Sequence, residues 1–352
     1  MQIFTPSHHA LQYMGRIDIN DPDAPVFHWA GSLVRFRFSG KYLAITLKDH
    51  RCYGEPAIGY VLDGIVGKLM LSADCNDIPQ TVQIPVEHNG THECIIYKRQ
   101  DATHCFTLTE IQLEDTGNLF DASPLPQRRI ECYGDSVSAG SVVEAYDHVA
   151  ACDPPVYDAT MDNAWYSYAM QTARLVGAQI HLNAQGGIAL LDHTGYFDNG
   201  NFGLETTYNK MGYLPFCGCS AWDFSRYTPD VVLLAVGQND HHVGNQDNCI
   251  PDDAKKEQWL ETYCNIIDDL MKKYPDATFV LLLTVLQHDP FWEGMIDDVC
   301  QRMQSPRVKR FRFTRTGIAT PGHPRRQEQC EMACELSEYL LSMGHSLWAS
   351  ER

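Results

Sequence analysis

The sequence lacks any apolar run long enough to span a bilayer. Its first residues, 1–13, also lack the basic stretch and following apolar stretch of a secretory signal. We therefore expect no membrane partner. We expect a cytoplasmic protein, or a secreted one if a leader has been removed.

Basic residues are scarce. Lys and Arg total 27 against 45 Asp and Glu, which gives a formal net charge of −18. Such a surface repels polyanions, so nucleic acid and anionic membranes are poor partners. A neutral ligand such as a sugar meets no electrostatic barrier.

Closely spaced metal-ligating residues are also scarce. The 13 cysteines are scattered, and only Cys217 and Cys219 form a tight pair. Because a structural zinc site needs a second pair at ligand spacing, we interpret these two as loop cysteines and predict no metal. Without a secretory signal the cysteines are expected to be reduced, including Cys94, Cys105 and Cys132 in core strands.

The first third of the chain alternates apolar and polar residues. Val34, Phe36 and Phe38 face one way, and short runs of this kind are separated by Gly, Asp and Asn turns. This pattern predicts an antiparallel sandwich of the jelly-roll kind. Asp63-Gly64 and Asn89-Gly90 each predict a hairpin turn, although Asn89 also begins a glycosylation sequon.

The pattern changes after a proline-bearing segment. Continuous apolar runs at 231–236 and 279–283 alternate with helical spacing, as in 163–178 and 257–274. Buried strands alternating with helices predict a three-layer α/β domain with a parallel sheet. With 352 residues the chain is long enough for two domains. The predicted units are a β-sandwich at 1–120, a linker at 121–128 and an α/β domain at 129–352.

Polar segments follow the predicted parallel strands. They are Gly134-Asp135-Ser136, Gly186 after the strand at 180–183, and Gly237-Gln238-Asn239-Asp240; His323 comes late in the chain. Taken alone, Gly134-Asp135-Ser136 is more often an ordinary turn or helix cap, and a lone loop histidine such as His323 is more often a surface residue. Gly186 fits a tight βα turn equally well, and Asn239 could be a helix cap or a loop residue. The carboxyl ends of parallel strands meet at one edge of the sheet, so together the segments predict a shared site there.

These four segments resemble the blocks of the SGNH (GDSL-type) hydrolase superfamily. The preceding sandwich, with 15–18 and 27–32 similar to opening strands, resembles carbohydrate esterase family 2. Members of that family are bacterial enzymes that remove O-acetyl groups from plant polysaccharides. The resemblance implies an SGNH hydrolase domain with a three-layer parallel sheet, preceded by an all-β jelly-roll that has a carbohydrate-binding role.

The resemblance also implies roles for individual residues. Ser136 would be the nucleophile and His323 the general base. The oxyanion hole would combine the Ser136 N–H, the Gly186 N–H and the Asn239 amide. Asp135 and Asp240 would brace the loops. The substrate would be an acetylated carbohydrate such as mannan or xylan, and no metal or cofactor is needed. The oligomeric state is left open.

One position departs from the family pattern. The family usually has Asp three residues before the His, where this chain has Thr320. We therefore predict a Ser–His dyad in which a backbone carbonyl orients His323, with an inactive enzyme as the competing interpretation. A second Asp-x-x-His, Asp101 to His104, lies in the predicted sandwich and is set aside. Trp292 is predicted either to stack on a sugar or to be a core or lid aromatic, with equal weight.

Two other functions remain open at this stage. An acyltransferase would use the same acyl-enzyme but exclude water. A carbohydrate-binding protein with a vestigial hydrolase domain would turn over no ester. Turnover of a small acetyl ester separates the binding protein from the enzymes, and products formed with a sugar acceptor separate the transferase from the hydrolase.

Overall fold

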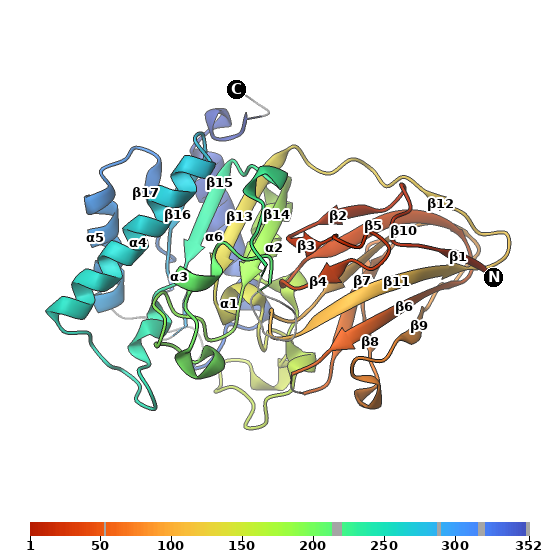
Figure 1. Ribbon diagram of the computed structural model, residues 1–352, viewed down its shortest axis with the longest axis horizontal. Helices are drawn as coiled ribbons and strands as arrows, with labels where there is room; N and C mark the ends of the chain where they lie inside the picture. Colours follow the sequence, from red (N-terminus) through yellow and green to blue (C-terminus); the bar gives the residue numbers. More distant parts are fainter. Residues whose placement is uncertain (53, 213–219, 287–289, 316–320, 350–352) are drawn as a thin grey trace.

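The computed structural model describes residues 1–52, 54–212, 220–286, 290–315 and 321–349. Cys217, Cys219 and Thr320 lie outside these ranges. A β-sandwich and an α/β domain lie side by side (Figure 1). The sequence prediction of an all-β unit followed by a parallel α/β unit is confirmed.

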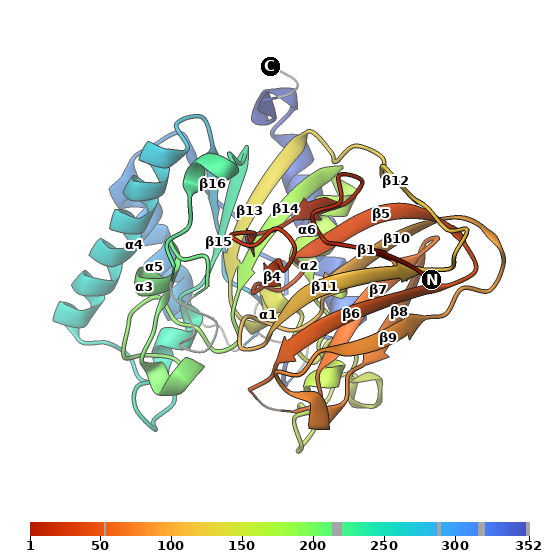
Figure 2. The ribbon, with the colours of Figure 1, turned by 45° about the vertical axis from the view of Figure 1, so that its right-hand side comes forward.

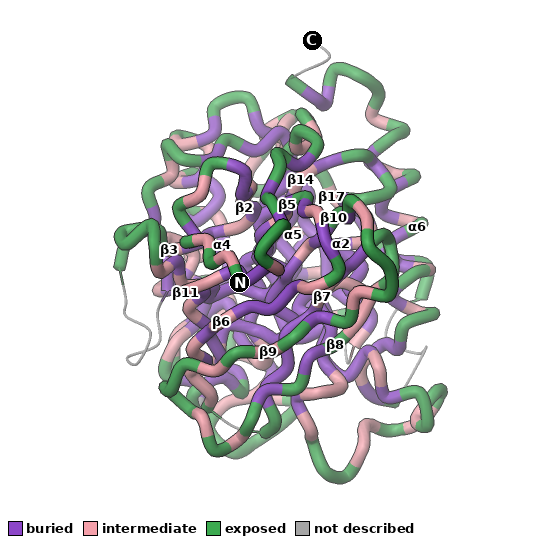
Figure 3. The backbone as a smooth tube through the Cα atoms, turned by 90° about the vertical axis from the view of Figure 1, so that its right-hand side faces the viewer, coloured by how far each residue is buried: buried purple, intermediate pink, exposed green. Residues whose placement is uncertain are grey.

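The N-terminal part is a sandwich of two antiparallel sheets. One contains β1 (Gln2–Phe4), β3 (Ile17–Asp18), β4 (Val26–Phe27), β6 (Leu43–His50), β9 (Gln80–Ile84) and β11 (Cys105–Leu113). The other contains β2 (Gln12–Met14), β5 (Leu33–Gly40), β7 (Ala57–Leu62), β8 (Ile65–Met70), β10 (Gly90–Lys98) and β12 (Leu119–Phe120). Alternate side chains of the strands, such as Phe36, Phe38 and Leu108, are fully buried between the sheets, and exposed residues lie at the turns and on the edge strands β8 and β9 (Figure 3).

The two predicted hairpin turns differ in outcome. Asp63 and Gly64 join the paired strands β7 and β8, with φ of 50° and 83°. These positive values are the ones that a two-residue turn between twisted strands requires. The hairpin at Asn89-Gly90 is wrong, because β9 pairs with β6 whereas β10 pairs with β5 and β7. The chain crosses there from one sheet to the other.

The C-terminal part is built on parallel strands in the order β14-β13-β15-β16-β17. Their bounds are β13 (Arg128–Gly134), β14 (Ala178–Ala184), β15 (Val231–Ala235), β16 (Thr278–Leu281) and β17 (Val308–Arg310). Helices α1 (Ser136–Ala139), α2 (Tyr168–Leu175) and α6 (Arg326–Ser342) pack on one face; α3 (Leu204–Thr207), α4 (Asp253–Lys273) and α5 (Pro290–Met303) pack on the other (Figure 1). Strand β15 is entirely apolar because both faces of the sheet are covered there, whereas β14 carries Gln179, His181 and Asn183 at alternate positions on one face.

The helices follow the apolar spacing with shifted ends. The helix expected at 163–178 is shortened to α2, because Ser167 caps its start through the Met170 N–H. A short 3-10 turn, Ala164–Tyr166, precedes it. Within the described ranges, none of the helices combines the length and the apolar composition that a membrane span requires.

The sandwich is fixed to the α/β domain by buried polar contacts. Arg16 Nη2 lies 2.9 Å from Glu131 Oε1 on strand β13, and both side chains are fully buried. Trp29 Nε1 donates to the Met211 carbonyl at 2.8 Å. The loop after β10 also packs there, with Arg99 paired to Glu144 at 2.6 Å. The two units therefore form one body rather than a tethered pair (Figure 2).

The expectation of reduced thiols needs one correction. Cys94 and Cys132 are free and buried, but Cys105 is disulfide-bonded. The alternation of β11 places Cys105 in a strand correctly, but periodicity along one strand cannot show which thiols approach one another in the fold.

Candidate active site

The site lies where three neighbouring strands end. Strand β13 is flanked by β14 and β15, and Gly134 is in register with Ala184 on one side and Ala235 on the other. The strand order changes direction at β13, which is the position where open parallel sheets bind ligands. The segments after these strands, which carry Ser136, Gly186 and Asn239, are therefore brought to one edge of the sheet.

Ser136 begins α1 directly after β13. Asp135 caps this helix, accepting from the Val137 N–H at 3.0 Å, and its other oxygen accepts from the Gln238 side-chain amide. Asp135 thus ties the Ser136 segment to the Asn239 segment. Burial raises the pKa of Asp135 to about 6. This supports the predicted bracing role for Asp135.

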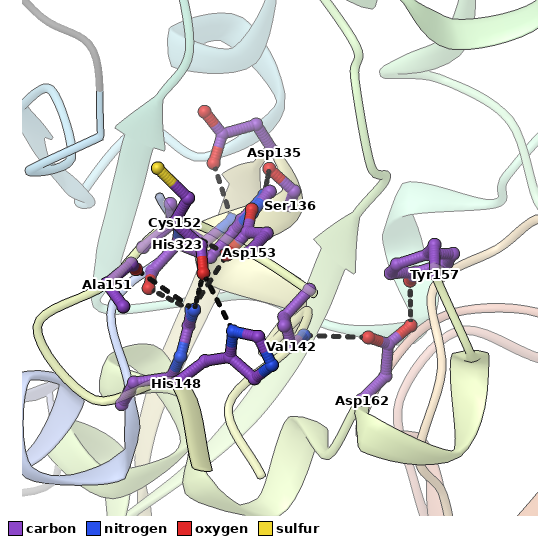
Figure 4. A network of polar contacts seen from close by, with 12 residues as sticks. Asp135, Ser136, Val142, His148, Ala151, Cys152, Asp153, Tyr157, Asp162 and His323 are labelled. Carbon is purple, nitrogen blue, oxygen red and sulfur yellow. Dashed lines mark hydrogen bonds and ion pairs between the residues drawn. The ribbon is translucent and has the colours of Figure 1, made fainter. Parts of the chain in front are cut away.

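His323 reaches Ser136 from the segment before α6. The distance from His323 Nε2 to Ser136 Oγ is 2.8 Å, within hydrogen-bond reach (Figure 4). The two residues are 187 positions apart in the sequence. With Nδ1 bonded to a carboxylate, Nε2 is the acceptor for the serine hydroxyl.

The group that orients His323 is a carboxylate, so the prediction of a backbone carbonyl is wrong. Asp153 Oδ2 lies 2.7 Å from His323 Nδ1, and Asp153 Oδ1 accepts from the His323 backbone N–H at 3.0 Å (Figure 4). The family pattern places such a carboxylate three residues before the histidine, where this chain has Thr320. The orienting carboxylate instead comes from the segment between α1 and α2, far earlier in the chain.

A buried arginine holds Asp153 in place. Arg325 Nη1 donates to Asp153 Oδ1 at 2.9 Å, and the Arg325 side chain is only 2% exposed. Partial burial raises the pKa of Asp153, but the bonds from His323 and Arg325 outweigh this effect and hold the pKa well below its usual range. Asp153 is therefore a charged acceptor near neutral pH. No spacing rule marks Asp153 among the 45 acidic residues.

Gly186 brings its backbone close to the site. A Cβ built on Gly186 would lie 2.6 Å from Asp101 Oδ2, so only glycine fits without a shift of that carboxylate. The Gly186 N–H donates to Asp101 Oδ2 at 2.9 Å. The N–H that the sequence analysis expected for an oxyanion is thus engaged with a carboxylate. Asp101 belongs to the Asp-x-x-His that had been set aside as remote.

Asn239 is held by the neighbouring loop. Its Nδ2 donates to the Ile188 carbonyl at 2.9 Å, which occupies one of its two N–H groups. Gly237, with φ of 129°, lets the backbone pass Trp259, where an added Cβ would lie 2.7 Å from the indole. Asp240 accepts from the N–H groups of Leu190 and Leu191 at 2.8 and 3.0 Å, which supports its predicted bracing role.

These residues surround one cavity of about 730 Å³. It is lined by residues from both domains, namely Cys52, Asp101, Thr103, Ser136, Ser141, Asp153, Tyr157, Gln185, Gly186, Gly187, Tyr196, Phe197, Asp198, Asn239, Asp247, Leu286, Pro321, Gly322 and His323. Its volume is in the range that takes small organic ligands. The structure therefore brings Ser136, Gly186, Asn239 and His323 together around one space.

Trp292 is not part of that cavity, and its assignment to sugar stacking needs correction. It lies in α5, is 2% exposed, and its ring packs against Trp259 with centroids 5.9 Å apart. It borders a separate cavity behind Asp240. Its position after an apolar strand predicted proximity to the sheet edge, but the helical spacing of α5 turns the indole into the core.

Among the described residues, Asp63, His88 and His92 form a group that could hold a metal ion. Asp63 lies at the β7–β8 turn of the sandwich, His88 lies between β9 and β10, and His92 lies in β10. His92 Nδ1 lies 2.7 Å from Asp63 Oδ2, and His92 Nε2 lies 3.2 Å from the His88 carbonyl. Both ring nitrogens of His92 thus already have protein partners.

Comparison with known proteins agrees with this architecture. Residues 13–123 match the family described as carbohydrate esterase 2 N-terminal. An acetylxylan esterase / glucomannan deacetylase of Cellvibrio japonicus is 29% identical over 94% of this chain and 88% of the relative. The cellulase/esterase CelE of Acetivibrio thermocellus is 29% identical over 76% of this chain, and the match spans 30% of CelE.

The structural comparison extends over almost the whole chain. A family two carbohydrate esterase from Clostridium thermocellum, solved in complex with cellohexaose, superposes with a TM-score of 0.79 at 25% identity, covering 95% of this chain and 98% of that one. Fold and comparisons together define a carboxylic ester hydrolase of the SGNH type. Within that class the chain resembles carbohydrate esterase family 2.

Proposed function

We propose that this protein is a carbohydrate O-acetyl esterase that works through an acyl-enzyme on Ser136. The observation that carries the proposal is the continuous series Asp153–His323–Ser136 at the wall of the cavity, with contacts of 2.7 and 2.8 Å. A carboxylate, an imidazole and a serine hydroxyl in this order are the parts that nucleophilic acyl transfer requires.

The geometry supports the following sequence of steps. His323 Nε2 takes the hydroxyl proton as Ser136 Oγ attacks the acetyl carbonyl carbon. Asp153 keeps the Nδ1 proton in place and stabilises the imidazolium that forms. His323 then protonates the departing sugar oxygen, leaving an acetyl ester on Ser136. Water, deprotonated by His323, releases acetate and restores the serine.

Negative charge on the carbonyl oxygen needs donors beside Ser136. We assign this role to the Ser136 backbone N–H, the Asn239 side-chain amide and the Gly186 N–H. Asn239 and Ser136 are each 8% exposed, so both are reachable from the cavity while the loops behind them stay buried. The Gly186 N–H can take part only after it releases Asp101.

Acetylated xylan or mannan is the substrate class we favour. One relative is named for acetylxylan and glucomannan, and one similar structure holds cellohexaose. The net charge of −18 is compatible with a neutral polysaccharide and unfavourable for an anionic one. Tyr157, Tyr196 and Phe197 line the cavity and supply aromatic surface for a sugar.

The test is acetate release from acetylated xylan and mannan oligosaccharides, with products identified by mass. The proposal predicts deacetylated products with the wild-type protein. Transfer of acetyl to an added sugar acceptor in preference to water would indicate an acyltransferase. Binding of the oligosaccharide without turnover would indicate a carbohydrate-binding protein.

A further inference from the structure

A carboxylate from the sandwich domain occupies a donor of the proposed oxyanion hole. Asp101 lies in the loop between β10 and β11 and is only 3% exposed. Its Oδ2 accepts from the Gly186 N–H at 2.9 Å and from Gln185 Nε2 at 2.9 Å. A catalytic oxyanion in the hole would need the same Gly186 N–H.

The position of Asp101 is fixed by its own loop and by the domain interface. Its Oδ1 accepts from the Thr103 N–H at 2.9 Å. Lys98, 2% exposed, donates to the carbonyls of Gln100 and Asp101 from beneath the loop. Gln100 Nε2 in turn donates to the Ala159 carbonyl of the α/β domain at 3.1 Å. The carboxylate is thus held at the site and does not reach it as a mobile surface group.

Engagement of the oxyanion hole by a substrate therefore has a consequence for Asp101. When the ester oxygen takes the Gly186 N–H, a buried carboxylate loses a charge-assisted hydrogen bond and needs another donor. A simple acetyl ester carries none. A sugar acetylated at one of its ring hydroxyls can carry a free hydroxyl on the adjacent ring carbon, and a hydroxyl can donate to a carboxylate.

We propose that Asp101 determines the specificity of the site by accepting a hydrogen bond from the sugar hydroxyl next to the acetylated position. Asp101 accepts this bond when the ester carbonyl takes its place on the Gly186 N–H. Because of this exchange, release of the Gly186 N–H by Asp101 depends on a hydroxyl in the alcohol part of the ester. The inference rests on the proposed esterase function and adds that Asp101, a residue of the sandwich domain, recognises a hydroxyl of the sugar.

The test compares two substrates and two forms of the protein. One substrate is a methyl xyloside carrying a single acetyl group with a free hydroxyl on the adjacent carbon; the other has hydrogen in place of that hydroxyl. We expect the wild-type protein to prefer the hydroxylated substrate by about ten- to hundredfold in kcat/KM, the effect of one charged hydrogen bond. Asp101→Ala should bring this ratio close to one, with Asp101→Asn in between.

Asp49→Asn is the matched control, because Asp49 is also a buried carboxylate of the sandwich, 4% exposed, and accepts from Gln80 at 2.9 Å away from the cavity. It should keep the wild-type ratio. An unchanged ratio in folded Asp101→Ala, or equal losses on both substrates, would overturn the inference and leave Asp101 as a brace for Gly186. If Asp101 variants fail to fold, equal rates for the two substrates with the wild-type protein would overturn it too. Absence of turnover of both substrates would contradict the proposed function.

Discussion

Asp153 lies 2.7 Å from Nδ1 of His323, although 170 residues separate them in the sequence. The same carboxylate receives the His323 backbone N–H and a bond from Arg325, so its orientation is fixed from three directions. Asp153 therefore has what the third member of a serine hydrolase triad requires, which is a defined tautomer of the histidine and a nearby negative charge.

The first prediction concerns Asp153. Asp153→Asn should lower kcat by about 10²–10⁴, because the amide removes the charge that stabilises the imidazolium and can favour the wrong tautomer. KM should change little. The measurement is steady-state kinetics on an acetyl ester, with Asp147→Asn as the control, since Asp147 lies in the same segment and is exposed. Retention of most activity in Asp153→Asn would indicate that Ser136 and His323 act as a dyad without Asp153.

The second prediction concerns the oxyanion hole. Asn239→Ala should lower kcat by about 10²–10³, the effect of losing one donor to the developing charge. Asn245→Ala, an exposed asparagine in the loop after it, should be close to wild type. Steady-state kinetics separates the possibilities. A loss seen only in KM would assign Asn239 to substrate binding rather than to the transition state.

The third prediction concerns the join between the domains. Arg16→Ala should lower the free energy of unfolding by about 3–5 kcal/mol, because it leaves Glu131 as an unpaired charge in the interior. Arg35→Ala removes the pair with Glu93, which is 49% exposed, and should cost less than about 1 kcal/mol. Urea unfolding of both variants checks this. Similar small losses would mean that the buried pair adds little to the interface.

The fourth prediction is a dependence of stability on pH. Burial raises the pKa of Asp162 to about 7, and Asp162 is 1% exposed. The folded state therefore binds a proton that the unfolded state releases at about pH 4. The stability this proton contributes is fully present below about pH 4 and is lost as the pH rises to about 7, at no more than about 1.4 kcal/mol per pH unit.

Urea unfolding of wild type and Asp162→Asn between pH 5 and 8 tests this dependence. The wild-type free energy should fall relative to that of Asp162→Asn as the pH rises to about 7, and the difference should then level off. Asp158→Asn, in the same segment and partly exposed, should follow the wild-type curve. Parallel curves for wild type and Asp162→Asn would show that Asp162 is ionised throughout this range.

Local patterns in the sequence were sufficient to predict the main architecture. Alternation in the first third of the chain and apolar runs such as 231–236 show which faces of the strands are buried. Which faces are buried in turn indicates the fold class. Ser136 and Asn239 could be found because each follows a strand by a few residues. The edge of a parallel sheet then brings such segments together.

The remaining features depend on contacts between distant parts of the chain. Asp153 and Asp101 reach the site from loops whose paths are set by packing between elements, and their own neighbours in the sequence carry no signal of this. Asn89-Gly90 has the composition of a hairpin turn, yet the strands beside it belong to different sheets. Trp292 follows a strand like the site residues, but the phase of α5 directs it inward.

The central claim is that Ser136 carries the acyl group, and one comparison tests it most directly. Acetate release from an acetylated xylo-oligosaccharide is measured for wild type and for Ser136→Ala, with circular dichroism to confirm that both are folded. The account predicts turnover by the wild-type protein and none above background by Ser136→Ala. The reason is that, among the described residues, the hydrogen-bond partner of His323 Nε2 is Ser136 Oγ, at 2.8 Å. Turnover by folded Ser136→Ala at a rate near that of the wild type would contradict it.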